Sequence, residues 1–228
     1  MTELWNAFIK AFELIFTFDS EVMEIAGRSL MISLTSAVLA SVICIPLAGL
    51  IHFNRFRGKR FLISLIQTFY SVPTVVVGLF VFVFISRAGP LGALGIMFTP
   101  TAIVVAQMIL ITPVLLGLTI SALRGVDISI LDTARSLGAS GFQMAALVVR
   151  EARFAVIAAV VMGFGRAISE VGISMMVGGN IRGFTRVITT AIALESSKGD
   201  LELALSLGII LIFIALVVNI IMNRVQQR

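Results

Sequence analysis

Hydrophobic residues run along most of the chain in long stretches that few charges interrupt. Five stretches are long enough to cross a membrane as helices, namely residues 29–51, 61–86, 100–123, 154–178 and 203–222. The first of them holds 23 residues without a charge, and this length spans a hydrocarbon core of about 30 Å. The pattern therefore predicts an all-α integral membrane protein with five transmembrane helices.

The N-terminal part of the chain follows a different pattern. Residues 4–18 carry apolar side chains at helical spacing, but Lys10 and Glu13 interrupt them. A segment this short and this polar does not span a bilayer comfortably. We expect residues 1–28 to form an N-terminal segment whose amphipathic helix lies at the interface, although deeper insertion would raise the count to six spans. Early acidic residues and the lack of a basic start argue against a signal peptide.

Two of the intervals between the apolar stretches are long and polar. Residues 124–153 form the longest polar interval, and residues 179–201 form a second one that contains a short apolar piece, 187–194. We expect the second interval to be an outer-face or re-entrant loop. Neither interval is long enough to fold alone, so the sequence predicts a single transmembrane domain over residues 1–228.

Composition and charge support the membrane interpretation and give an orientation. The chain is 59% hydrophobic and 13% charged, whereas soluble domains are about one quarter charged. The net charge of +5 does not indicate nucleic-acid binding, because the basic residues lie at the ends of apolar runs. Ten Lys and Arg fall after the first and third stretches and in the C-terminal tail, against six in the other loops. The positive-inside rule then puts the N-terminus outside and both the C-terminus and residues 124–153 in the cytoplasm.

The sequence offers little for catalysis or metal binding. With one histidine, His52, and one cysteine, Cys44, a metal site or a Ser-His-Asp set has no support. A phosphate-binding loop of the GxxxxGK[ST] kind is also missing. We therefore expect no catalytic residue, metal or cofactor on this chain, and any ATP must be used by a partner.

Polar residues inside the apolar stretches are candidates for a transport pathway. Arg166 and Glu170 are four residues apart in one predicted helix, so they can pair on one face. Charges within a membrane usually face a bundle interior or an aqueous cavity, and this pair could equally fix helix packing. The uncharged candidates could instead be hydrogen-bond partners between helices; they are Gln107, Thr112 and Ser169.

The interval 124–153 has the features of a docking surface. A short helix with Asp132 near its start would place an acid at the positive end of the helix dipole. Ala134 and Gly138 are small, so one side of this helix would let another protein approach closely. The chain can turn after Gly138. A second helix over 142–153 would lead back into the membrane. An ordinary helical loop explains the same pattern.

A resemblance favours docking. DTARSLGASG resembles the cytoplasmic EAA loop of ABC importer permeases, with Asp132-Thr133-Ala134 at the EAA positions and Gly138 at the family spacing. Arg150 and Glu151 stand where the pattern has Leu-Pro. The resemblance implies a coupling helix that contacts an ATPase through Asp132, Thr133, Ala134, Arg135, Ser136, Leu137, Gly138, Ala139 and Ser140.

A second resemblance concerns the cargo. GRAISEVGISMMVGGNIRG, residues 165–183, resembles the molybdate, sulfate and tungstate permeases, and the run GFTRVITTAIALESSKGD is most similar to the tungstate type. This implies a type I ABC importer permease fold in a prokaryotic inner membrane. It also implies a homodimer, two cytoplasmic ATPase subunits that carry ATP and Mg, and an extracytoplasmic oxyanion-binding protein. The alternatives are molybdate or sulfate as cargo, an ion-coupled secondary transporter, or a membrane scaffold without transport.

Overall fold

The computed structural model describes residues 2–226, and within that range the chain is helical with no strand. This confirms the predicted all-α class. Two short 3-10 turns, η1 (Phe69–Ser71) and η2 (Gly92–Leu94), accompany the α-helices. The α-helices are α1 (Thr2–Phe16), α2 (Ser20–Phe53), α3 (Lys59–Thr68), α4 (Thr74–Ile85), α5 (Pro100–Arg124), α6 (Ile128–Ser136), α7 (Gly141–Glu151), α8 (Arg153–Ile168), α9 (Gly172–Gly178), α10 (Ile188–Lys198) and α11 (Leu201–Gln226).

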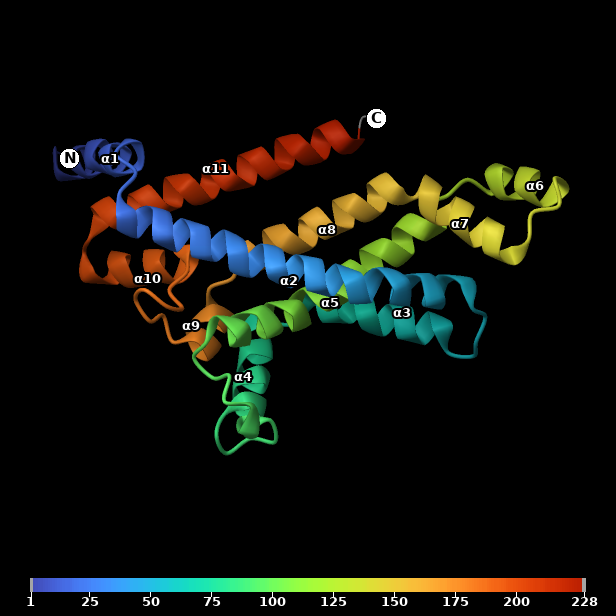
Figure 1. Ribbon diagram of the computed structural model, residues 1–228, viewed down its shortest axis with the longest axis horizontal. Helices are drawn as coiled ribbons and strands as arrows, with labels where there is room; N and C mark the ends of the chain where they lie inside the picture. Colours follow the sequence, from blue (N-terminus) through green and yellow to red (C-terminus); the bar gives the residue numbers. More distant parts are fainter. Residues whose placement is uncertain (1, 227–228) are drawn as a thin grey trace.

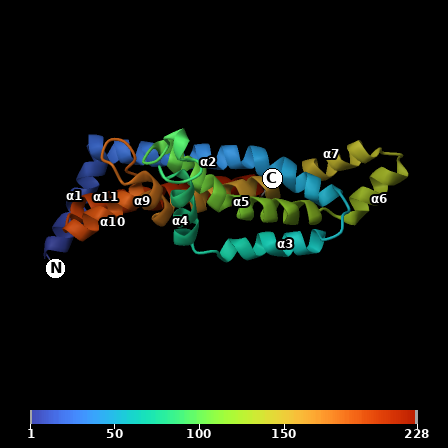
Figure 2. The same ribbon diagram turned by 90° about the horizontal axis from the view of Figure 1, so that it is seen from below.

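The long helices run along one axis of the molecule. Helix α2 packs against α5 and α8, and α11 packs against α8, so these four helices form the bundle (Figure 1). Helices α6 and α7 project at one end, whereas α1 and α10 lie at the opposite end (Figures 1 and 2). The loop after α2 lies at the same end as α6 and α7, as the charge pattern predicts for two loops on one side of a membrane.

Three helices, α2, α5 and α11, are each long and apolar enough to cross a membrane. Two bent pairs could each form a broken span, which gives up to five crossings. The predicted stretches 61–86 and 154–178 are these bent pairs. The first bends by 99° between η1 and α4, and the second by 61° between α8 and α9. Proline explains the first break, because Pro73 has no N–H to donate to the preceding turn.

Helix α2 begins earlier than the apolar pattern suggests. The Asp19 carboxylate accepts hydrogen bonds from the backbone N–H groups of Glu21 (3.0 Å) and Val22 (3.1 Å). This N-cap satisfies donors that a helix start otherwise leaves free. The helix therefore extends about two turns beyond residues 29–51 on this side, and it continues through Pro46 to Phe53.

Helix α1 lies across the start of α11, and it is not among the helices long and apolar enough to span. Its packed face is small, with Ala7 and Ala11 buried, and the Ser206 hydroxyl donates to the Ala11 carbonyl (3.3 Å). Trp5 and Phe16 face away from the bundle. Small buried side chains on one face and exposed aromatic side chains on the other make α1 amphipathic.

Small residues let the bundle helices approach closely. On α2 the buried positions include Ala37, Ala40, Cys44 and Ala48, which pack in the core shared with α5 and α8. Helix α4 leaves the bundle almost at right angles to its axis (Figure 1) and docks on α9. A side chain at Gly78 would lie 3.3 Å from the Ile173 Cα atom, so this contact depends on a glycine.

Candidate functional site

Helix α6 and helix α7 form a hairpin that projects from the bundle (Figure 1). Helix α6 begins at Ile128, because the Asp127 carboxylate accepts the Ser129 N–H (2.8 Å) and caps the helix. This hydrogen bond holds the pKa of the Asp127 carboxyl below its usual range. The first turn of α6 is therefore held by an acid that the sequence interpretation did not use.

The predicted helix start near Asp132 is wrong. Asp132 lies in the second turn of α6, where its carboxylate pairs with Arg135 (3.3 Å) in an exposed contact. The helix ends at Ser136, so the positions from Leu137 to Ser140 form the turn and not a helix. Asp127 and Asp132 are both residues of a type that caps helices. The unpaired backbone N–H groups of the first turn of α6 follow Asp127, so Asp127 forms the cap.

The turn between α6 and α7 is set by backbone geometry. Gly138 adopts φ +78°, and its N–H donates to the Arg135 carbonyl (3.0 Å). The Ala139 N–H donates to the Ala134 carbonyl (3.0 Å), which completes the bond pattern of a left-handed helix end. Helix α7 then starts with a capping box, in which Ser140 N–H donates to the Gln143 side chain (2.7 Å) and Gln143 N–H to the Ser140 hydroxyl (3.3 Å).

Large apolar side chains lie exposed on the hairpin. Leu137 is 83% exposed and Phe142 is 84% exposed, on either side of the Gly138 turn. Ile128 is also exposed at the start of α6, where no residue is fully buried. A cavity of about 360 Å³ between the two helices is lined by Ala134 and Leu147, among others. Exposed apolar patches of this kind are typical of protein contact surfaces.

The hairpin is joined firmly to the bundle at its base. Val148 of α7 and Ala152, the residue between α7 and α8, are buried with Leu123 of α5 and Val156 of α8. Helix α8 begins only one residue after α7 ends. Packed side chains, and not a flexible linker, therefore connect the hairpin to α5 and α8.

A groove of about 720 Å³ opens between α5, α8 and α11. Most of its wall is apolar, and its polar side chains come from four places in the sequence: Tyr70, Arg166, Ser169 and Asn219. The Arg166 Nε atom is buried, and within residues 2–226 it has no hydrogen-bond partner. The groove thus joins two of the predicted pathway residues with two that the sequence interpretation missed. Asn219, an amide within the apolar part of α11, was the signal for one of them.

The other uncharged candidates do not line this groove. Gln107 is buried, with its side-chain oxygen 2.9 Å from the Ser36 hydroxyl and its amide nitrogen donating to the Ala167 carbonyl (3.0 Å). It therefore links α2, α5 and α8 as a structural hydrogen-bond partner. The Thr112 hydroxyl donates to the Met108 carbonyl one turn earlier (2.7 Å). Within the described part of the chain, no three metal-ligating side chains lie together.

The predicted pair of Arg166 and Glu170 does not form. Helix α8 ends at Ile168, so the two residues do not share a helix and their i, i+4 relationship is lost. Glu170 is buried, and its carboxylate accepts the Ile173 N–H (3.1 Å) at the start of α9. Its carbonyl accepts the Thr189 hydroxyl (2.8 Å) from α10. Glu170 thus caps α9 with its carboxylate and binds α10 through its carbonyl, whereas Arg166 faces the groove.

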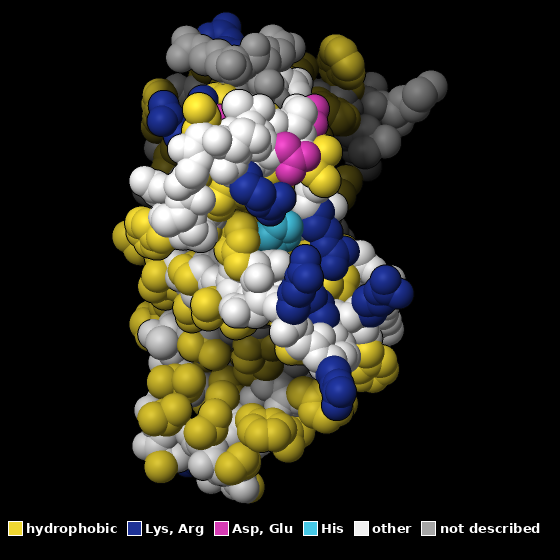
Figure 3. Space-filling model, turned by 90° about the vertical axis from the view of Figure 1, so that its right-hand side faces the viewer, with side chains coloured by type: hydrophobic (Ala, Val, Ile, Leu, Met, Phe, Trp, Pro, Cys, Tyr) yellow, Lys and Arg dark blue, Asp and Glu magenta, His cyan; other side chains and the backbone are white. Residues whose placement is uncertain are grey.

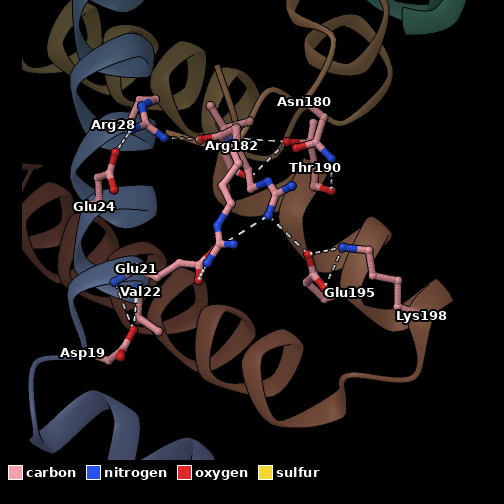
Figure 4. A network of polar contacts seen from close by, with 12 residues as sticks. Asp19, Glu21, Val22, Glu24, Arg28, Asn180, Arg182, Thr190, Glu195 and Lys198 are labelled. Atoms are coloured by element: carbon pink, nitrogen blue, oxygen red, sulfur yellow. Dashed lines mark hydrogen bonds and ion pairs between the residues drawn. The ribbon is translucent and has the colours of Figure 1, made fainter. Parts of the chain in front are cut away.

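At the opposite end of the molecule, charged residues join segments far apart in the sequence (Figure 4). Arg186 is buried between Glu195 (3.3 Å) and Glu21 (3.7 Å). Arg182 also binds Glu21, and this bond raises the Arg182 pKa. The Arg28 side chain donates to the Arg186 carbonyl (3.1 Å). The predicted apolar piece 187–194 lies in this region as α10, a helix packed on α11 and α2.

Comparisons with known proteins agree on the kind of protein this chain resembles. Residues 40–228 match the family model described as binding-protein-dependent transport system inner membrane component. The tungstate uptake system permease protein TupB of Peptoclostridium acidaminophilum is 40% identical over 227 residues, which cover all of both chains. A probable anion ABC transporter permease protein of Haloferax volcanii is 40% identical over 212 residues, 91% of each chain.

The fold is shared with a much more distant protein. A chain in an inward-facing structure of the MetNI methionine ABC transporter superposes with a TM-score of 0.73 at 16% identity, covering 94% of this chain and 97% of that one. At this identity the likeness speaks for the fold alone. It confirms the expected type I ABC importer permease fold.

Proposed function

Because the chain belongs to the family of binding-protein-dependent transport system inner membrane components, it is a membrane pore component and not an enzyme, and we propose that its cargo is tungstate. The observation that carries the proposal is the 40% identity to a tungstate uptake permease across both full chains. Molybdate and sulfate are the alternative cargoes, since they are oxyanions of the same charge and similar shape.

The α6–α7 hairpin is the proposed contact with a cytoplasmic ATPase. Its exposed apolar side chains, Leu137 and Phe142 at the tip and Ile128 at the start of α6, need a partner surface to leave water. The capped and tightly turned backbone makes the tip a preorganised element. The buried base at Val148 transmits motion of the tip to α5 and α8, which border the groove. ATP and Mg belong to the partner, because ATP hydrolysis requires groups that this chain does not offer.

Two copies of the chain are proposed to enclose the pathway, with an ATPase below each copy and an oxyanion-binding protein on the outer face. The charge pattern puts α6 and α7 in the cytoplasm and the Arg186 region outside. The network around Arg186 holds the segment 179–187 in a fixed shape there. A fixed surface suits the repeated docking of a binding protein.

The groove between α5, α8 and α11 is the proposed inner part of the pathway. Arg166 is the one residue among its lining side chains that carries a charge. A guanidinium suits an oxyanion because it presents a fork of N–H donors. A single cation on an apolar wall attracts the anion without holding it too tightly for release. Ser169, Tyr70 and Asn219 would add neutral hydrogen-bonding groups along the same wall.

We predict that Arg166→Ala reduces oxyanion uptake about tenfold, because a hydrogen bond to a charged group contributes about 1.5–3 kcal/mol. Arg166→Lys keeps the charge but loses the fork, so its uptake should lie between the two. The measurement is radiolabelled tungstate uptake normalised to permease abundance. Arg87→Ala removes an exposed cation that is not among the residues lining the groove, and it serves as the control. Unchanged uptake by Arg166→Ala at normal abundance would exclude the residue from the pathway.

The cargo itself is tested with the complete transporter. The chain should be expressed together with its proposed ATPase and binding-protein partners, and uptake measured with tungstate, molybdate and sulfate in competition. Calorimetry of the binding protein with the three anions should show the same order of preference, with tungstate first. Uptake that persists without the ATPase and follows an ion gradient would replace this proposal with a secondary transporter.

A further inference from the structure

The loop after α2 carries a cluster of positive charges that has no role in the proposed transport function. Arg55, Arg57, Lys59 and Arg60 fall within six residues, and the last residue of α5, Arg124, joins them. In Figure 3 the Lys and Arg side chains crowd around the histidine at this end of the molecule. They surround a cavity of about 430 Å³, which is lined by Arg55, Phe56, Gly58, Lys59, Arg60 and Arg124. We call these six residues the basic pocket.

The basic pocket lacks a counter-charge from the protein. Within residues 2–226 none of its cations forms a salt bridge. The Lys59 ammonium instead donates to the carbonyls of His52 (2.6 Å) and Asn54 (3.1 Å), at the negative end of the α2 dipole. The nearest acid in sequence, Asp127, accepts the Ser129 N–H as the cap of α6. Like charges held this close are stabilised when an anion from outside binds between them.

The position of the basic pocket relative to the membrane indicates the source of that anion. It lies where the charge-free runs 29–51 and 100–123 both end, on two helices that can cross a membrane. Runs of this length cover about 35 Å at about 1.5 Å per residue, so the pocket lies just beyond the hydrocarbon core. Phe56 within the pocket is exposed, as are Phe53 and Phe61, which are close to it in the sequence. Aromatic side chains at this level contact lipid.

From these observations we propose that the basic pocket binds the headgroup of an anionic phospholipid. The phosphate lies among the guanidinium groups of Arg55, Arg60 and Arg124, and the acyl chains pass the exposed phenylalanines. A free phosphate or oxyanion would use the guanidinium groups but gain nothing from the aromatic side chains. The inference rests on the proposed orientation only for assigning the lipid to the cytoplasmic leaflet, where anionic headgroups attract such basic clusters.

The test needs neither cargo nor ATPase, so its outcome is independent of the transport proposal. The purified full chain in detergent is titrated with dioleoylphosphatidylglycerol or dioleoylphosphatidylcholine, and native mass spectrometry counts the lipids retained. We expect the wild type to retain phosphatidylglycerol in preference to phosphatidylcholine. Arg60→Gln should weaken this binding about fivefold, and Arg60→Gln with Arg124→Gln about 30-fold.

Two controls define the result. Arg87→Gln removes an exposed cation distant from the pocket and should retain the lipid like the wild type, and thermal unfolding should show that all variants are folded. Phe56→Ala with Phe61→Ala should weaken lipid binding while leaving the charges in place. Equal retention of both lipids, or equal retention by the wild type and the Arg60/Arg124 double variant, would overturn the proposal. Displacement of the lipid by millimolar sodium phosphate or tungstate, with no loss in the phenylalanine variant, would show a free-anion site and also overturn it.

Discussion

Replacing Gly138 with valine is expected to lower both ATPase binding and uptake about tenfold. Gly138 adopts φ +78°, a conformation that costs most L-residues about 1–2 kcal/mol and a β-branched residue more. A Cβ atom at this position would meet nothing within 4 Å, so the penalty comes from the backbone and not from a clash. Relief of the strain would redirect the turn and move Leu137 relative to Phe142. The measurement is co-purification of the ATPase together with tungstate uptake.

Two variants separate backbone strain from added bulk. Gly138→Asn should retain most of the binding, because asparagine tolerates the left-handed region. Gly141→Val adds the same side chain three residues later, where φ lies outside the left-handed region and a Cβ atom also meets open space. It should behave like the wild type. If Gly141→Val is as damaging as Gly138→Val, bulk on the docking surface is the cause and the left-handed turn is not.

Long apolar runs predicted the parts of the fold that depend on local sequence alone. The stretches 29–51, 100–123 and 203–222 became α2, α5 and α11, since a helix satisfies its backbone hydrogen bonds internally in lipid. The family resemblance was likewise correct. The orientation, the dimer and the pathway residues stay predictions. Of the two broken helices, the one in 61–86 carries a proline, Pro73, that marks its break. The break between α8 and α9 lies in an interval without a proline, so it was harder to foresee.

Several contacts of single residues in the site also could not be predicted from local sequence. Arg166 and Glu170 pair only if the helix continues past Ile168, and it does not. Gly172, at the start of α9, was the available sign of a break. Asp127 caps α6 in place of Asp132 because the cap depends on which backbone donors are free. Tyr70 lines the groove by lying over Gly117 of another helix, a contact that no local pattern encodes.

Replacing Arg186 with leucine is expected to destabilise the protein by about 3 kcal/mol and to lower its thermal midpoint by about 6–12 °C. The Arg186 and Glu195 side chains are only 9% and 6% exposed, at a separation of 3.3 Å. Removing the guanidinium leaves the Glu195 carboxylate buried, with Lys198 (3.1 Å) as its remaining cation. It also frees Glu21 on α2 from one of its two arginines. Thermal unfolding in detergent measures the change.

Burial of the ion pair, and not the number of charges removed, should set the size of this effect. Arg182→Leu removes a cation from the same loop that also binds Glu21, but its side chain is 72% exposed. Water already screens that contact, so the thermal midpoint should change little. The double variant Arg186→Leu with Glu195→Leu should lose less than the sum of the two single variants, because it leaves neither charge buried alone. Equal midpoints for Arg186→Leu and Arg182→Leu would mean that the network is dispensable, and the segment 179–187 would then need another explanation for its fixed shape.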